Sequence, residues 1–410
     1  MTASLTRAGT DTVRGQNLEY LDAHLQKYID AGKLTGTLTA VYHRGQLAHW
    51  RTQGLADRER NTPVRDDTIF RIYSMTKPIV SVALMQLYER GLLQIDDPVH
   101  KYIPSWEGLR VYQSGTHPTF ATTPCERPMT VRDLLSHQAG LTYGFASHTN
   151  VDAAYRQLSI GRLDVASLAD FVERLSGVPL DFSPGTAWNY SHATDIVGYL
   201  VEVISGQPLD VYLQEQIFKP LGMVDTGFSV SAQQASRFAS NYAGDKDGSL
   251  NLVDDAGDSA YLRPPAMLSG GGGLVATAGD YLRFCQMLLG KGTLEGARII
   301  GRKTLELMTR NHITGGKTIA EAATAPRWRE NPQQGTGFGL GFAVTLDPAV
   351  AQVSTSPGTY YWSGAASTHF WIDPVEDLAV VFMTQYMTLS SETRLNLARE
   401  VRAIVYGALE

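Results

Sequence analysis

The stretch SMTKPIVSVALMQLY, residues 74–88, is the part of the sequence that decides the fold. After Lys77 nearly every residue is apolar, and Pro78 is tolerated there because the first amides of a helix have no helical partner. A helix that is apolar on all sides must be buried between layers of structure. The sequence therefore predicts a buried helix from Pro78 to Arg90.

Strand signals gather at the two ends of the chain. Near the start, Thr37–His43 and Gln46–Thr52 are β-prone runs on either side of Arg44-Gly45, which is typical of an antiparallel hairpin. Near the end, further runs at 338–346, 359–362, 368–372 and 378–384 precede a predicted helix at 392–406. The segments between are mostly helical in pattern. We expect an α+β protein whose N- and C-terminal segments form one antiparallel sheet flanked by helices, with a mainly helical domain inserted.

The length of 410 residues suggests more than one domain. We assign residues 1–80 and 330–410 to a sheet domain and residues 81–329 to a mainly helical domain, and we expect the active site at their interface. Polar loops at 110–129, 231–267 and 311–335 are long for a compact protein, and long loops are often functional. They are candidates for the walls or lid of a pocket.

Composition and charge exclude several classes of function. Lys and Arg number 35 against 41 Asp and Glu, so no surplus of cations is present to bind nucleic acid. Cys125 and Cys285 lie far apart, as structural thiols of a reducing compartment would. No signal-peptide core and no uncharged apolar run of about 18 residues is present, so we expect a cytoplasmic protein without a membrane span. The ten histidines lack metal-ligand spacing, so no metal is expected.

Ser74 and Lys77 are candidates for nucleophilic catalysis. Three-residue spacing in a first helical turn brings the hydroxyl and the amine together on one face. A serine hydroxyl is a poor nucleophile until a base takes its proton, and lysine is a base only when neutral. Burial and the positive end of the helix dipole both disfavour the ammonium form. Taken alone, however, the pair also fits a surface Ser and Lys near a helix start.

Two later segments could complete such a site. Tyr190 lies between a Pro-Gly turn and a helix start, where its hydroxyl could relay protons at the edge of a pocket, although a half-buried core tyrosine has the same pattern. Small residues follow the strand-borne Trp362, so a backbone amide there could form half of an oxyanion hole. A bulged strand explains that segment equally well.

Together the motifs Ser74-Met75-Thr76-Lys77, Tyr190-Ser191-His192 and Trp362-Ser363-Gly364 resemble those of the serine β-lactamase and penicillin-binding-protein superfamily, in order and in rough spacing. Within it the chain resembles class C β-lactamases and, best of all, the family VIII carboxylesterases. The resemblance runs from about residue 18 to residue 406. It includes short sequence motifs at 134–141, 218–223 and 270–274.

The resemblance implies a role for each motif residue. Ser74 would be the nucleophile and Lys77 its base, with Tyr190 sharing the proton and passing it to the leaving group. The backbone amides of Ser74 and Ala365 would form the oxyanion hole. Substrate would contact Trp362, Ser363, Gly364 and His192, and no cofactor is implied.

Two differences from the β-lactamase motifs bear on the class of substrate. Trp362 stands where β-lactamases have a lysine that helps to hold the substrate carboxylate, so we expect neutral esters and an alkaline pH optimum. His192 replaces the usual asparagine, which puts the acyl-side hydrogen bond of β-lactamases in doubt.

The sequence thus predicts a carboxylesterase that hydrolyses short-chain acyl esters through an acyl-enzyme on Ser74, with weak β-lactamase activity as a side reaction. Three alternatives stay open. The first is an acyltransferase of the same fold, and the second is a β-lactamase or D-amino peptidase. The third, from another class, is a non-catalytic penicillin-binding sensor that is acylated once.

Overall fold

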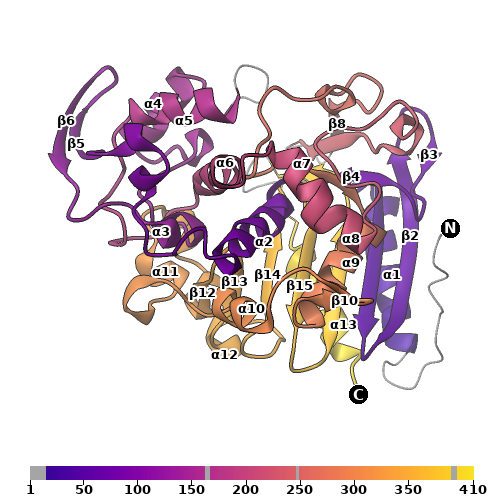
Figure 1. Ribbon diagram of the computed structural model, residues 1–410. Helices are drawn as coiled ribbons and strands as arrows, with labels where there is room; N and C mark the ends of the chain where they lie inside the picture. The colour runs from indigo at the N-terminus through magenta and orange to yellow at the C-terminus, as the bar shows by residue number, and fades with distance from the viewer. Residues whose placement is uncertain (1–14, 162–166, 246–248, 389–394) are drawn as a thin grey trace.

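The computed structural model describes residues 15–161, 167–245, 249–388 and 395–410, and its centre is an eight-stranded antiparallel sheet (Figure 1). The strand order is β12-β13-β14-β15-β16-β1-β2-β3. The indigo strands from the beginning of the chain and the yellow strands from its end therefore belong to one sheet, joined where β1 pairs with β16. The expected α+β fold, with a sheet assembled from both ends of the chain, is confirmed. The strands are β1 (Gly36–His43), β2 (Gln46–Asp57), β3 (Thr62–Pro63), β12 (Thr336–Phe338), β13 (Ala343–Thr345), β14 (Tyr360–Ser363), β15 (His369–Asp373) and β16 (Leu378–Met383).

Helices cover both faces of the sheet, and β16 shows why. All six of its side chains are buried. Alternate residues of a strand point to opposite faces, and Leu378, Val380 and Phe382 accordingly join the core beneath helices α1 and α13. The residues between them join the larger core that contains α2 and α9. The helices are α1 (Gly15–Asp30), α2 (Thr76–Glu89), α3 (Val131–Leu135), α4 (Asn150–Gln157), α5 (Leu168–Ser176), α6 (Ala193–Ser205), α7 (Leu209–Leu213), α8 (Lys219–Leu221), α9 (Ala278–Leu289), α10 (Arg302–Met308), α11 (Ile319–Ala322), α12 (Pro348–Ala351) and α13 (Leu397–Gly407).

The predicted hairpin between β1 and β2 is present. Arg44 and Gly45 have φ values of 46° and 80°, the pair of positive angles that a two-residue type I′ turn requires. The strand predicted at 338–346, in contrast, is split into β12 and β13. Between them Gly341 adopts a φ of 95°, and a Cβ there would collide with Ser81 of α2. The close approach of the chain to α2 therefore interrupts the strand.

The middle of the chain carries more strands than its pattern suggested. The loop at 110–129 forms a hairpin that projects from one end of the molecule, and the loop at 231–267 contains two strands of a small sheet. Helix α9, which the predicted boundaries place in the helical part, packs on β15 and β16. The boundaries themselves stay a prediction. These additional strands are β4 (Ile69–Arg71) with β9 (Val275–Thr277), β5 (Arg110–Thr116) with β6 (Thr119–Pro124), β7 (Asn241–Gly244) with β8 (Leu250–Asp254) and β17 (Tyr386–Met387), and β10 (Thr293–Leu294) with β11 (Ala297–Arg298).

The described ranges contain no helix long and apolar enough to span a bilayer. The last predicted helix begins in residues 392–394, which lie outside the described part, and its described portion is α13.

Candidate active site

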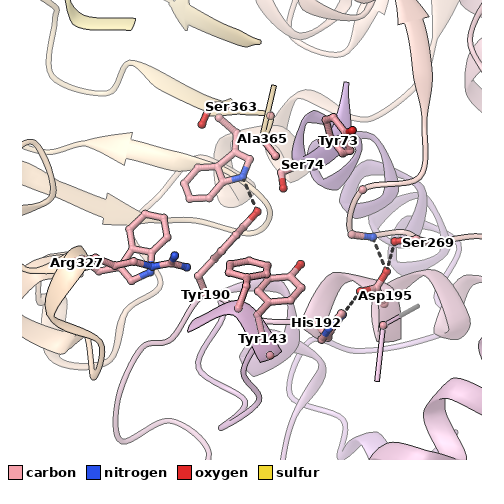
Figure 2. A pocket seen from close by; sticks show the side chains of 18 of the residues that line it. Tyr73, Ser74, Tyr143, Tyr190, His192, Asp195, Ser269, Arg327, Ser363 and Ala365 are labelled. Carbon is pink, nitrogen blue, oxygen red and sulfur yellow. Dashed lines mark hydrogen bonds and ion pairs between the residues drawn. The ribbon is translucent and has the colours of Figure 1, made fainter. Parts of the chain in front are cut away.

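A cavity of about 890 Å³ lies against β14 on one side and the helical part on the other (Figure 2). Residues that the sequence singled out from three distant segments line it together. These are Ser74, Tyr190, His192, Trp362, Ser363, Gly364 and Ala365. Lys77 lies behind Ser74 and contacts it directly.

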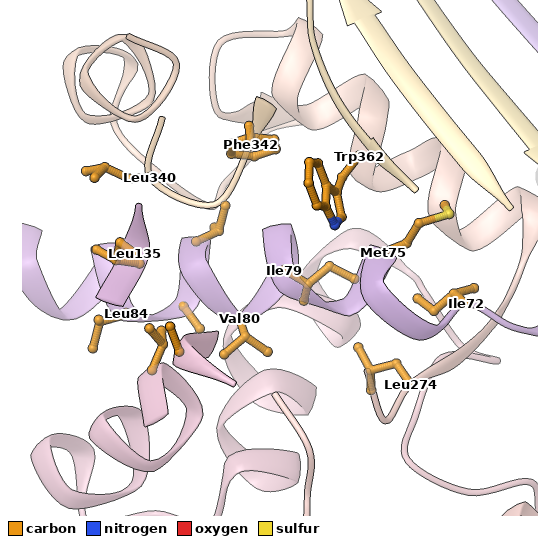
Figure 3. Packing of buried hydrophobic residues seen from close by; sticks show 14 of the residues in the cluster. Ile72, Met75, Ile79, Val80, Leu84, Leu135, Leu274, Leu340, Phe342 and Trp362 are labelled. Carbon is orange, nitrogen blue, oxygen red and sulfur yellow. The ribbon is translucent and has the colours of Figure 1, made fainter. Parts of the chain in front are cut away.

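The segment that carries Ser74 is held in place by apolar packing. Residues 76–87 of α2 are all buried, as the predicted helix requires. Figure 3 shows Ile79 and Val80 of this helix inside the large core, which also includes Trp362 of β14. Just before the helix, Tyr73 has a φ of 42°, in the left-handed region that few residues other than glycine adopt. This sharp turn presents the half-buried Ser74 to the cavity.

Lys77 is 1% exposed, and three oxygen atoms surround its amine. Nζ lies 3.2 Å from Oγ of Ser74, 3.0 Å from the hydroxyl of Tyr143 and 2.6 Å from the carbonyl oxygen of Gly271. Three acceptors match the three N–H donors of an ammonium group. The same contacts put the amine within reach of the serine proton.

Tyr190 approaches Lys77 with its ring rather than with its hydroxyl. Nζ lies 4.6 Å from the ring centroid, a cation–π distance. The hydroxyl instead accepts a hydrogen bond of 3.3 Å from Nε1 of Trp362. The predicted base and the predicted proton relay are therefore neighbours without a direct hydrogen bond between their polar atoms.

Tyr143 is a residue of this site that the sequence reasoning missed. Its hydroxyl accepts the hydrogen bond from Lys77, and its ring stacks on Phe145 at 4.6 Å between centroids. Burial, with the negative charge of Asp195 adding to it, raises the pKa of Tyr143 well above 10.0, so the phenol keeps its proton at neutral pH. Its position two residues after the motif at 134–141 was the signal that could have revealed it.

The backbone after Trp362 approaches the turn before Ser74 closely. A Cβ on Gly364 would collide with the carbonyl oxygen of Ile72, so only glycine fits between β14 and the turn before Ser74. This contact brings Ala365 to the same wall as Ser74 (Figure 2). The arrangement suits the pair of backbone donors that an oxyanion hole needs.

His192 also lines the cavity, but its polar contact is internal. Nδ1 lies 2.7 Å from a carboxylate oxygen of Asp195, and the ring lies 4.2 Å from that of Tyr143. In this geometry His192 shapes the wall beside Tyr143.

Three arginines bring positive charge to the cavity, one from α4, one from α13 and one from a loop. Arg156, Arg327 and Arg399 line it, together with Glu330. The guanidinium carbon of Arg327 lies 5.2 Å from the ring centroid of Phe145 and 5.3 Å from that of Trp328. Arg327 belongs to the loop at 311–335, one of the predicted pocket walls. Replacement of the motif lysine by Trp362 therefore does not leave the cavity without cations.

Within the described ranges, no three His, Cys, Asp or Glu side chains come together as ligands of a metal ion would. The groups arranged for chemistry are a hydroxyl, an amine, two phenols and backbone amides, and these can support acyl transfer through a covalent intermediate.

Comparison with known proteins agrees with this geometry. Residues 21–403 match the beta-lactamase family. Protein Rv1367c of Mycobacterium tuberculosis (strain ATCC 25618 / H37Rv) is 36% identical over 373 residues, 90% of each chain. Esterase EstB of Burkholderia gladioli is 32% identical over 386 residues, 89% of each chain. The structure titled "EstCE1, a hydrolase with promiscuous acyltransferase activity" has a TM-score of 0.80 at 27% identity and covers 96% of this chain and 99% of its own. The chain therefore belongs to the beta-lactamase family, and within it to the family VIII carboxylesterases that its motifs resemble.

Proposed function

We propose that this protein is a serine carboxylesterase that hydrolyses short-chain acyl esters through a covalent intermediate on Ser74. The observation that carries the proposal is the 3.2 Å contact between Nζ of Lys77 and Oγ of Ser74 at the cavity. A base within hydrogen-bond reach of a serine hydroxyl is what nucleophilic catalysis requires. The relative EstB, which is an esterase, supports the same reaction class.

The reaction has two halves that use the same groups. Oγ of Ser74 attacks the ester carbonyl carbon while its proton passes to the neutral amine of Lys77. The carbonyl oxygen becomes an oxyanion, which the amides of Ser74 and Ala365 stabilise. The bond to the alcohol then breaks, and the alcohol leaves with a proton from Lys77 through a tyrosine hydroxyl. A water molecule next attacks the acyl carbon and gives a proton to Lys77. The bond from the acyl carbon to Oγ of Ser74 then breaks, Oγ takes that proton back from Lys77, and the acid is released.

Two tyrosines divide the proton handling in this proposal. Tyr143 shares the proton of Lys77 directly, because their polar atoms are 3.0 Å apart. Tyr190 delivers the proton to the leaving group, since its hydroxyl lies at the cavity with Trp362 as a donor. Accepting that hydrogen bond makes the Tyr190 oxygen a poorer base and its own O–H a better donor.

Substitution of the nucleophile tests the proposal, with p-nitrophenyl butyrate as the substrate. We expect Ser74→Ala to lower kcat by about 10⁴-fold or more. Ser81→Ala is the matched control, because Ser81 is a buried serine of the same helix whose hydroxyl has no hydrogen-bond partner in the described structure. Equal activity in Ser74→Ala and the parent would refute the proposal. A single stoichiometric burst without turnover would instead indicate the penicillin-binding sensor.

Acyl transfer to an alcohol is the second candidate. It is favoured by the size of the cavity, about 890 Å³, which leaves room for a second substrate beside a short acyl group. The structural relative EstCE1 is described as a hydrolase with promiscuous acyltransferase activity. Partition of one acyl donor between water and added alcohol separates the two reactions. Turnover of a cephalosporin in the same assay measures the weak β-lactamase activity that the motifs predict.

A further inference from the structure

A fully buried carboxylate lies behind the active-site lysine. Asp195, in the first turn of α6, is 1% exposed. One of its oxygens contacts Nδ1 of His192 at 2.7 Å. The other accepts hydrogen bonds from Oγ of Ser269 at 2.6 Å and from the backbone N–H of Gly271 at 2.8 Å (Figure 2). A buried charge is tolerated only when it is paired in this way, so the three donors indicate a site built around an ionised carboxylate.

The loop that Asp195 holds is the loop that holds Lys77. Gly271 donates its N–H to Asp195 and accepts, through its carbonyl oxygen, the 2.6 Å hydrogen bond from Nζ of Lys77. A Cβ on Gly271 would lie 2.8 Å from a carboxylate oxygen of Asp195, and a Cβ on Gly270 would lie 2.6 Å from the carbonyl oxygen of Thr194. The glycine run at residues 270–273 therefore has a specific role. It lets the backbone pass between α6 and the amine.

We propose that Asp195 is a positioning residue of the active site, which fixes the carbonyl of Gly271 against Lys77 and supplies the buried negative charge that stabilises this lysine once it has taken the proton of Ser74. The inference rests on the proposed esterase function, in which Lys77 is the base.

Asp195 is the only anion among the titratable groups that face Lys77 in the described structure from the elements packed around it. His192 is the residue just before α6, Tyr190 lies two residues earlier with its ring against Nζ, and His137 and Tyr143 follow α3. Burial, together with the charge of Lys77, lowers the pKa of His137 well below 6.5, so that ring is neutral. The phenol of Tyr143 is neutral for the reason given above. Asp195 therefore supplies the negative charge that compensates the positive charge of protonated Lys77.

The carboxylate stays ionised across the working pH range. Burial raises the pKa of Asp195, but the hydrogen bond and charge of His192, the hydrogen bond of Ser269 and the charge of Lys77 outweigh it and bring the pKa below 3.8. Removing this negative charge makes the ammonium form of Lys77 less favourable. The amine is then a weaker acceptor for the serine proton, and the pH dependence of kcat should change with it.

The test is Asp195→Asn, which keeps the shape and the oxygen that faces Ser269 and Gly271. We expect kcat for p-nitrophenyl butyrate to fall about tenfold to 100-fold with KM within about threefold, as for loss of a group that acts only in the transition state. The acid limb of the pH profile of kcat should move down by about half a pH unit or more. Asp195→Glu, which restores the charge, should return the limb toward its original pH.

Asp152→Asn is the matched control. Asp152 is a carboxylate of the same burial that bonds Thr142 and caps α4, without contact to the glycine loop. Its variant should keep the parent's pH profile. If Asp195→Asn keeps both the parent's acid limb and its kcat, or loses activity only as Asp152→Asn does, Asp195 is merely structural and the proposal is overturned.

A second variant covers the case in which Asp195→Asn does not fold, as judged by circular dichroism. Ser269→Ala removes one of the two bonds from the loop to the carboxylate but keeps the charge, so kcat should fall about threefold to tenfold with the acid limb in place. Full activity in Ser269→Ala, beside an unfolded Asp195→Asn, would overturn the proposal as well. Failure of the esterase function itself is distinguished from these results, because the parent would then show no turnover that depends on Ser74.

Discussion

The body of helix α2 and its first turn are buried in different ways. From Ile79 onward, α2 is surrounded by apolar side chains of one large core. At its first turn, Lys77 is surrounded by polar atoms from a preceding turn, a loop after α3 and the glycine run before β9. Both regions are buried, yet one is buried in hydrocarbon and the other in oriented dipoles.

The apolar contacts determine the position of α2, whereas the polar contacts determine the reactivity of Lys77. Apolar contacts act over the area they bury and tolerate small changes of shape, so they fix where the helix lies. The hydrogen bonds around Lys77 depend on single atoms, so each one changes the proton affinity of the amine. Substitutions in the helix body should therefore change stability, whereas those around its first turn should change catalysis.

The largest expected effect compares Lys77→Ala with Ile79→Ala. Loss of the base should lower kcat by about 10³-fold to 10⁴-fold. Ile79 is fully buried, and truncating it should lower the free energy of unfolding by about 2–4 kcal/mol while kcat stays within about threefold. Steady-state kinetics and urea unfolding of both variants measure the two effects. If Ile79→Ala lost activity as Lys77→Ala does, the separation of placement from reactivity would be wrong.

The next effect concerns the two phenols. Tyr190→Phe removes the proposed donor to the leaving group and should lower kcat about 100-fold or more for esters of poorly acidic alcohols. The loss should shrink for p-nitrophenyl esters, whose leaving group needs no proton. Kinetics on ethyl butyrate beside p-nitrophenyl butyrate measures the difference.

Tyr143→Phe is the counterpart of that variant. It removes only the hydrogen bond to Lys77, so kcat should fall about tenfold for both kinds of ester. A loss that depended on the leaving group in Tyr143→Phe, and not in Tyr190→Phe, would show that the two roles are exchanged.

The smallest effect is the pH dependence of the parent enzyme. Lys77 accepts the serine proton only as the neutral amine, so activity should rise with pH by about tenfold per unit along the acid limb and reach its optimum in the alkaline range. The phenol of Tyr143, whose pKa is raised well above 10.0, remains protonated throughout that rise. A profile of kcat/KM from pH 5 to pH 10 tests this, and a maximum at or below about pH 6 would contradict it.

The sequence predicted features that are set by neighbouring residues. The buried helix after Lys77, the turn at Arg44-Gly45 and the strands at both ends all follow from local patterns of apolar residues and turn residues. The split of the strand at 338–346 did not, because it depends on the distance from Gly341 to Ser81 of another element.

The residues of the site also divide into those placed by neighbouring residues and those placed by distant elements. Ser74 and Lys77 are neighbours because a helical turn makes them so. The contact from Tyr143 to Lys77 and the entry of Arg327 into the cavity depend on loops at least 66 residues away from Lys77, and no local pattern encodes them. Tyr190 was placed at the cavity by its motif, but the partner of its hydroxyl, Trp362, is 172 residues away.

The pairing of β1 with β16 has a consequence for biosynthesis. Leu38 lies opposite Met383, so the central ladder cannot close until nearly the whole chain has left the ribosome. The segment that bears the nucleophile is translated early, but β14, which forms the opposite wall, arrives late. Chains released prematurely therefore carry Ser74 without Ala365, the residue proposed to complete the oxyanion hole. Under the proposed mechanism such fragments lack part of the catalytic site, and the long-range pairing of β1 with β16 slows the completion of folding.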